Sequence, residues 1–182
     1  MIYREAGLPG AWLIEPERRG DERGWFARTM DAEELAARGM GHVFVQQNAS
    51  ASTRKGTLRG LHFQRAPHAE AKLIRCVRGR ILDVILDLRR GSPGYMRHEG
   101  FELSAENGHM VYVPQGFAHG FQTLTDDAEV SYLVSAAYAP DAEGGLRWDD
   151  PRLGIAWPLP VSVLSPKDAA WPLLESDDPG LF

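Results

Sequence analysis

The sequence predicts an all-β fold, an antiparallel sandwich or barrel with one or a few short helices. Short apolar or alternating runs recur between turn signals rich in Gly, Pro, Asn and Asp, which is typical of such folds. The chain has 182 residues and a mass of 20.2 kDa, enough for one well-buried core without requiring two domains. We therefore predict a single domain over residues 1–182.

The first predicted element in chain order is a helix at residues 30–39, "MDAEELAARG". Asp31 can cap it with Glu34 three residues later, and Gly39 suits its C-terminal exit. The period-two and apolar runs then predict strands at residues 42–46, 59–64, 71–79, 80–88, 98–104, 109–116, 119–124 and 129–138.

The run at residues 80–88 alternates apolar and polar positions, so we interpret it as a scaffold strand buried on one face. The proline-rich tail from Pro151 onward is expected to form a strap. The barrel core is then expected at about residues 40–140, with N-terminal strands and the strap packed on it.

Charge and cysteine content exclude several classes of protein. A net charge of -5 and a pI near 5.7 argue against a nucleic-acid partner. Cys76 is the single cysteine of the chain, so no disulfide can form within the chain, and we expect a reducing compartment. Charges interrupt every apolar stretch of the first 24 residues, which fits neither a signal peptide nor a membrane span. We expect a cytoplasmic protein without a membrane partner.

Two short segments point to chemistry. In "RGLHFQ", residues 59–64, His62 and Gln64 have equal parity and share a strand face, and Glu70 and Lys72 form a second such pair. The segment "GHMVYVPQGFAHG", residues 108–120, has the spacing of the second motif of cupins. This resemblance narrows the fold to a cupin-like antiparallel jelly-roll barrel.

Aligned with the cupin pattern, the metal-ligand set is broken. Gln64 stands in place of a histidine, Lys72 in place of a carboxylate, and only His119 matches the remaining ligand. An ammonium group repels a divalent ion but stabilises an oxyanion, so we predict no metal site. A histidine base beside a lysine suits proton abstraction next to a carbonyl, which is enolate chemistry without a metal.

An ordered set of motifs over nearly the full chain resembles the dTDP-4-dehydrorhamnose 3,5-epimerase family. The motifs are "GDERGWF", "VQQNASASTRKGTLRGLHFQ", "KLIRCVRGRILDVILDLRRGSP", "LSAENGHMVYVPQGFAHGF", "YAPDAEGGLRWDDPRLGIAWP" and "LSPKDAAWPLL". Any one of them indicates only a cupin barrel, whereas the ordered set is specific. The resemblance implies a dimeric, cofactor-free isomerase of deoxysugar biosynthesis of the dTDP-rhamnose type. It would invert C3, C5 or both, the carbons that flank the ketone of a nucleotide-linked 4-keto-6-deoxy sugar.

The resemblance also assigns roles by position. It implies that His62 removes the proton from the sugar and that Asp168 orients the His62 ring. A carboxylate hydrogen-bonded to an imidazole fixes its tautomer and favours the imidazolium form. Lys72 would stabilise the enolate oxygen, and Tyr132 would return a proton from the opposite face. Arg23 and Arg59 would hold the diphosphate, because arginine forks fit phosphate oxygens.

The other residues that the resemblance places in the sugar or nucleotide pocket are Phe26, Gln46, Asn48, His119, Tyr138, Glu143 and Lys167. An N-terminal strand that carries Arg23 and Phe26 is expected to reach into the partner subunit's site.

Taken singly, the four catalytic candidates also have structural interpretations. His62 could be a structural histidine whose ring nitrogens are hydrogen-bonded, and Lys72 could be a surface lysine of a strand. Tyr132 could be a core tyrosine with a hydrogen-bonded hydroxyl. Asp168 could cap the turn after Pro166.

The sequence departs from the family pattern at four positions, which the resemblance places near the nucleotide and sugar. Glu70 stands where glutamine is usual, Arg19 where an aromatic residue is common, Arg28 where an acidic one is common, and Leu133 where a lysine often follows the tyrosine. A mono-epimerase, or an enzyme for another nucleotide-linked ketosugar, is therefore an alternative. Two others are a metal-dependent cupin that uses His62, Gln64, Glu70 and His119, and a sugar-binding protein without turnover.

Overall fold

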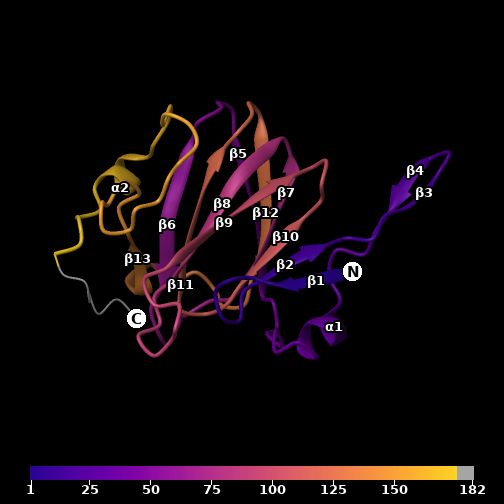
Figure 1. The fold of residues 1–182 in the computed structure, drawn as a ribbon, viewed down its shortest axis with the longest axis horizontal. Helices are drawn as coiled ribbons and strands as arrows, with labels where there is room; N and C mark the ends of the chain where they lie inside the picture. The colour runs from indigo at the N-terminus through magenta and orange to yellow at the C-terminus, as the bar shows by residue number, and fades with distance from the viewer. Residues whose placement is uncertain (176–182) are drawn as a thin grey trace.

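The computed structural model describes residues 1–175, in which two antiparallel sheets pack face to face (Figure 1). The last seven residues of the predicted domain lie outside the described residues. The first sheet has the order β1-β2-β10-β7-β12-β5 and the second the order β13-β6-β11-β8-β9, while β3 and β4 form a hairpin of their own. All named strand pairs are antiparallel. The cupin-like jelly roll predicted from the sequence is confirmed.

The strands of the first sheet are β1 (Ile2–Glu5), β2 (Trp12–Glu15), β10 (Met110–Val113), β7 (Lys72–Arg78), β12 (Ala128–Val134) and β5 (Gln46–Ser52). Those of the second are β13 (Glu143–Gly145), β6 (Leu58–Gln64), β11 (Phe117–Thr123), β8 (Arg80–Asp87) and β9 (His98–Ser104). The hairpin consists of β3 (Arg19–Asp21) and β4 (Gly24–Phe26). Three short helices complete the described elements of residues 1–175: α1 (Ala32–Ala36), the 3-10 turn η1 (Pro140–Ala142) and α2 (Pro166–Ala169).

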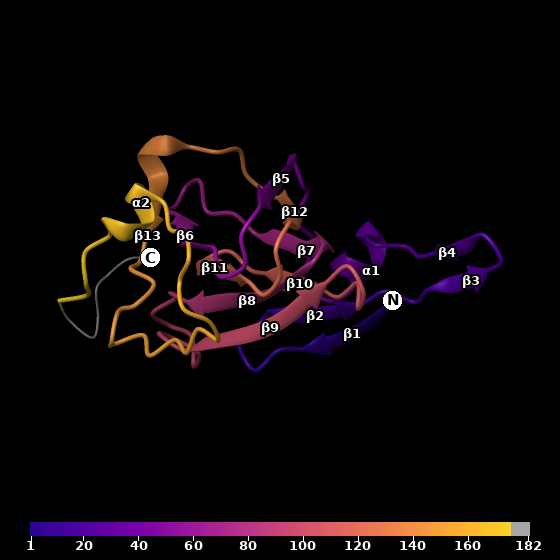
Figure 2. The ribbon, with the colours of Figure 1, turned by 90° about the horizontal axis from the view of Figure 1, so that it is seen from above.

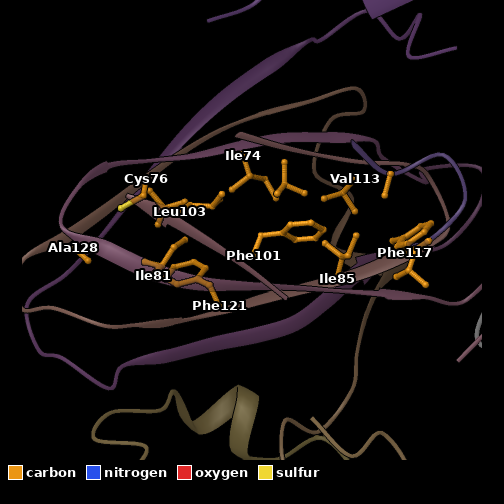
Figure 3. Close-up of a cluster of buried hydrophobic side chains, with 14 residues drawn as sticks. Ile74, Cys76, Ile81, Ile85, Phe101, Leu103, Val113, Phe117, Phe121 and Ala128 are labelled. Atoms are coloured by element: carbon orange, nitrogen blue, oxygen red, sulfur yellow. The ribbon is translucent and has the colours of Figure 1, made fainter. Parts of the chain in front are cut away.

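The main core fills the space between the two sheets. Ile74 of β7, Ile85 of β8 and Phe117 of β11 belong to it, and Figure 3 shows their side chains converging between the strands. Burial of such side chains supplies the dominant favourable term of folding. The arrangement leaves one end of the sandwich, beside β6 and β12, for polar side chains.

Two smaller clusters cover the outer faces of the sheets. On the second sheet, Leu153 and Trp157 of the C-terminal tail pack against Phe63 of β6 and Leu86 of β8. On the first sheet, Leu35 of α1 packs into the third cluster of buried residues. The tail thus crosses the outer face of the second sheet as a strap, and it brings α2 to β6 (Figure 2).

The predicted helix is present in shortened form. The Asp31 side chain accepts hydrogen bonds from the backbone NH groups of Glu33 and Glu34, as the cap predicts. Gly39 has a φ of 79°, and the NH of Met40 bonds to the carbonyl of Leu35, which is a Schellman exit. The helix therefore begins and ends at the signals read from the sequence.

Most predicted strands are confirmed, but residues 42–46 are not a strand. Residues 42–45 lie outside the sheets with Val43 78% exposed, and β5 begins only at Gln46. The apolar run misled the prediction, because the polar segment "QQNASAS" supplies the edge strand instead. Strands β1 to β4 and β13 were not individually predicted because each has only three or four residues.

Strand β8 also differs from the expectation of burial on one face. It lies between β11 and β9, with Ile85 in the central core and Leu86 under the strap. Both faces are covered, so Asp83 and Asp87 are fully buried. Strands β1, β2 and β13 join the two sheets from outside residues 40–140, so the sheets draw on more of the chain than the expected core.

The β3–β4 hairpin projects away from the sandwich, at the end opposite to α2 (Figure 1). Trp25 and Phe26 on it are 58% and 69% exposed. Among the helices of residues 1–175, none has the length and apolar character needed to cross a membrane.

Candidate active site

A cavity of about 360 Å³ opens at the polar end of the sandwich. The second sheet and α2 contribute His62, His119 and Asp168 to its wall, and the first sheet contributes Lys72 and Tyr132. An adjoining cavity of about 160 Å³ shares His62, Lys72 and Tyr132 and adds Gln64 and Glu70. His62 and Gln64 both line the smaller cavity, as expected for two residues on one strand face, and Lys72 and Glu70 line it as well.

His62 is paired with a buried carboxylate. Its Nε2 lies 2.6 Å from Oδ1 of Asp168, whose residue is 3% exposed. Burial acts to raise the pKa of Asp168, but the hydrogen bond and charge of His62, with the Gly60 NH and the Ser165 hydroxyl, bring the pKa below its usual value. Asp168 is therefore ionised at neutral pH, and an ionised partner stabilises an imidazolium.

The local sequence explains how Asp168 reaches β6. Ser165 caps α2 by accepting a hydrogen bond from the Asp168 NH, and Pro166 occupies the first turn of the helix. Asp168 Oδ2 also accepts a hydrogen bond from the Gly60 NH, 3.3 Å away. Gly60 has a φ of 125°, and a Cβ there would lie 2.5 Å from the Gly120 Cα, so this close strand approach requires glycine. The alternative that Asp168 itself caps the turn is wrong.

Lys72 and Tyr132 come from the facing sheet, where β7 and β12 are neighbours. Lys72 is buried, and its Nζ lies 3.1 Å from Oε1 of Glu70. Burial, followed by the charge of Glu70, raises the pKa of Tyr132, against a smaller lowering by Arg59. Tyr132 is thus a protonated phenol at neutral pH, and the interpretation of Lys72 as a surface lysine is wrong.

The remaining predicted residues divide between the two cavities. Arg59 and Lys167 line the larger one, and Gln46, Asn48, Tyr138 and Glu143 line the smaller one. Glu143 accepts hydrogen bonds from the Lys167 ammonium and from the Tyr138 hydroxyl. Burial acts to raise the pKa of Glu143, but these two hydrogen bonds and the charges of Lys167 and His62 lower it. This carboxylate bridges β13, α2 and the segment after β12.

Arg23 and Phe26 lie elsewhere, on the β3–β4 hairpin. Arg23 is paired with Asp21 at 2.5 Å, and its side chain is 85% exposed. Phe26 lines a separate hollow with Arg19 and Arg28. The β3–β4 hairpin that carries Phe26 lies at the far end of the molecule from α2 (Figure 1). The structure therefore does not bring these two residues to the cavity of the same chain.

Sequence reasoning missed two polar residues of the site. Asp83 of β8 is fully buried and holds His119, with Oδ2 at 2.7 Å from Nε2. Ser50 lines the larger cavity, and its buried hydroxyl has no hydrogen-bond partner among the described residues. An aspartate inside the apolar run "RILDVILD" was the available signal for the first, because a buried carboxylate needs a partner. No signal in the sequence marks Ser50.

Of the four departures from the family pattern, only Glu70 lines the cavities of its own chain. Arg19 and Arg28 line the hollow near the hairpin, and Leu133 packs on the outer face of the first sheet. Residues 1–175 contain no group of three or more His, Cys, Asp or Glu side chains placed to hold a metal ion. The alternative metal centre on His62, Gln64, Glu70 and His119 is therefore not among the groups that these residues form.

The family profile described as dTDP-4-dehydrorhamnose 3,5-epimerase matches residues 5–176 of the chain. A protein of that description from Sinorhizobium fredii is 45% identical over 176 residues, which cover 96% of this chain and 90% of the relative. A dTDP-4-dehydrorhamnose 3-epimerase from Streptomyces niveus is 42% identical over 184 residues, covering 100% of this chain and 88% of the relative.

Solved structures of this family also resemble the chain in fold. The crystal structure of dTDP-4-dehydrorhamnose 3,5-epimerase from Bacillus anthracis with TDP and PPi bound superposes with a TM-score of 0.92 at 44% identity. The match covers 95% of this chain and 99% of that chain. The similarity therefore includes every element that carries the two cavities.

The pair of His62 and Asp168 predicts a measurable titration. We expect His62→Ala to raise the pKa of Asp168, because burial is then opposed by fewer favourable contacts. Carbon-13 NMR of the carboxyl groups measures this pKa, with Asp168→Asn identifying the signal. His98→Ala, which changes an exposed histidine of β9, is the control and should leave the signal in place.

The lowered pKa of Asp168 also makes the stability of the fold depend on pH. Because the folded-state pKa of Asp168 lies below the unfolded value, the pair stabilises the fold above the unfolded pKa. That contribution is lost as pH falls through the folded value. An Asp168 pKa identical in wild type and His62→Ala would contradict the assignment of the pair.

Proposed function

The chain belongs to the dTDP-4-dehydrorhamnose 3,5-epimerase family, and on that premise we propose that it inverts C3, C5 or both in a dTDP-linked 4-keto-6-deoxyhexose. The observation that carries this proposal is the set of side chains that face one another across the larger cavity. A histidine with a buried carboxylate partner, His62 with Asp168, comes from one side of the sandwich. Tyr132 and Lys72 come from the facing sheet.

The first step is proton abstraction next to the ketone. Neutral His62 takes the proton from carbon and becomes an imidazolium, which ionised Asp168 stabilises. The electron pair of the broken C–H bond moves onto the carbonyl oxygen to give an enolate. The ammonium of Lys72 favours that negative charge, and a cavity that is partly closed to water strengthens the effect.

The second step returns a proton to the other face of the same carbon. A sugar ring that lies between the sheets has His62 on one side and the protonated Tyr132 hydroxyl on the other. Donation from Tyr132 as the enolate reverts to the ketone inverts the carbon. Return of the proton from His62 only restores the original configuration.

The nucleotide part of the substrate requires cations at the mouth of the cavity. Arg59 is held at the mouth by hydrogen bonds to the Ser52 hydroxyl and the Ala51 carbonyl, which suits bidentate contact with a diphosphate. The Bacillus anthracis relative binds TDP and PPi, which supports a thymidine diphosphate here. The adjoining cavity, with Asn48, Tyr138 and Glu143, supplies hydrogen-bonding groups for sugar or nucleotide.

A mono-epimerase is the second candidate. The Streptomyces niveus relative is a 3-epimerase, and its identity to this chain is close to that of the 3,5-epimerase from Sinorhizobium fredii. Inversion at one carbon or two depends on how long the intermediate stays bound and how its ring can flip. The exchange experiment below separates the two.

We also propose that the chain acts as a homodimer whose β3–β4 hairpin reaches the partner's cavity. The exposed Trp25 and Phe26, and the absence of Arg23 and Phe26 from the cavity of their own chain within residues 1–175, support this arrangement. A cytoplasmic location fits a nucleotide-linked substrate and the buried free thiol of Cys76, and cell fractionation would test it.

Proton NMR of dTDP-4-keto-6-deoxyglucose in deuterium oxide tests the function directly. With wild-type protein we expect the C3 and C5 proton signals to disappear and a new configuration to form. Loss at one carbon alone identifies a mono-epimerase. His62→Ala should slow the exchange by about two orders of magnitude or more, because the base is removed. Exchange at the wild-type rate in His62→Ala would eliminate His62 as the base.

Tyr132→Phe separates inversion from exchange. The variant keeps His62 and Lys72 but lacks the donor hydroxyl, so we expect net inversion to fall more than deuterium uptake at the first carbon. The same NMR experiment reads both rates in one sample. Equal losses would show that Tyr132 positions the ring and does not donate the proton.

Mixing two impaired variants tests the shared site. In a mixed dimer of Arg23→Ala and His62→Ala, one cavity has both an intact His62 and an intact hairpin from its partner. We therefore expect activity to return after subunit exchange. A mixture of His62→Ala with Lys72→Ala is the control, because both changes affect the same cavity and no intact site forms. Failure of the first mixture to recover would contradict the shared site.

A further inference from the structure

Glu70 is a carboxylate of the candidate active site that has no role in the proton-transfer steps of the proposed function. It lies just before β7, and its side chain is 13% exposed. Its two carboxylate oxygens have different partners. Oε1 lies 3.1 Å from the Lys72 ammonium, and Oε2 lies 3.4 Å from the amide nitrogen of Gln64.

Gln64, the second neighbour of the Glu70 carboxylate, is itself fixed by hydrogen bonds to the backbone. The Gln64 amide donates to the carbonyl of His68 at 3.0 Å, and its oxygen accepts from the NH of Ala139 at 2.7 Å. Reciprocal hydrogen bonds join Ala71 to Ser135, so the start of β7 is tied to the end of β12. The carboxylate therefore has a defined position relative to both strands.

The pairing with Glu70 matters because Lys72 is long and mobile by itself. Its ammonium sits on a four-carbon stem with several rotatable bonds. Among the described residues it forms one ion pair, with Glu70, and its side chain is 10% exposed. Without that partner the ammonium would be a buried, uncompensated charge free to turn toward other acceptors in the cavity.

The charge of Glu70 also reaches Tyr132. A nearby carboxylate disfavours tyrosinate, and after burial its charge is the largest cause of the raised pKa of Tyr132. Other elements bring further titratable groups to the cavities around Tyr132. Strand β6 supplies Arg59 and His62, β11 supplies His119, β13 supplies Glu143, and α2 supplies Lys167 and Asp168. Of these, Arg59 acts on Tyr132 in the opposite direction.

We propose that Glu70 is a positioning residue of this site, which holds the Lys72 ammonium at the ketone oxygen. The inference rests on the proposed function, since a fixed ammonium serves enolate chemistry. Glu70 exchanges no proton with the substrate in this role. It acts through Lys72, by fixing the position of the ammonium.

Glu70→Ala removes the hydrogen-bonding partner of Lys72. We expect deuterium uptake by the ketosugar to fall by about tenfold or more, with KM nearly unchanged, because Lys72 is no longer held in place. We also expect the Tyr132 phenol to titrate at lower pH, because the carboxylate that disfavours tyrosinate is gone. Ultraviolet absorbance of tyrosinate measures this titration without any substrate, and subtraction of Tyr132→Phe isolates the Tyr132 signal.

Glu70→Asp separates position from charge. The shorter side chain withdraws the carboxylate from Lys72 but keeps the negative charge near Tyr132. Exchange should therefore fall while the tyrosine titration stays close to that of wild type. The matched control is Glu129→Ala, the same truncation on β12, where the carboxylate faces Arg78 at the surface. It should change neither readout, and circular dichroism and thermal unfolding confirm that each variant is folded.

Failure of the role of Glu70 and failure of the proposed epimerase function give different results. Active wild-type protein with unaltered exchange in Glu70→Ala, or with an unaltered Tyr132 titration, would overturn the role of Glu70 and leave the epimerase standing. Wild-type protein that exchanges no proton of any dTDP-4-keto-6-deoxy sugar would overturn the proposed function, and the role of Glu70 with it. Loss of exchange with a lowered Tyr132 titration supports both.

Discussion

The hydrogen bond between His62 and Asp168 joins residues 106 positions apart, and the site depends on it. Asp168 reaches β6 only because the C-terminal strap crosses the second sheet and ends in α2, capped by Ser165. The strap in turn packs on apolar residues of β6 and β8. Apolar packing on the outer face of a sheet thus positions an ionised carboxylate at its polar end.

Other polar side chains of the site also have partners. Lys72 pairs with Glu70, Lys167 pairs with Glu143, and the His119 ring lies 2.7 Å from a carboxylate oxygen of Asp83. Charges in a partly buried cavity are costly unless they are paired and hydrogen-bonded. The pairs also fix the side chains before substrate binds, so little reorganisation is needed when charge develops on a carbonyl oxygen.

The two-sheet architecture supplies the stereochemistry. A single sheet presents its side chains to one face of a ligand, whereas facing sheets present different groups to both faces. Here the second sheet carries His62 and the first carries Tyr132. Inversion of a carbon needs groups on both sides of the ring, and the proposed roles of His62 and Tyr132 use this arrangement.

The sequence by itself determined the fold class, most strands, the cap of α1 and the identity of His62, Lys72, Tyr132 and Asp168 as candidates, because periodicity, turn residues and ordered motifs are local properties. Only the tertiary structure decided which charges meet. The pair of Asp83 with His119, and the distance of Arg23 and Phe26 from the cavity of their own chain, follow from strand order and burial. These depend on the placement of residues far apart in the chain, which local patterns do not encode.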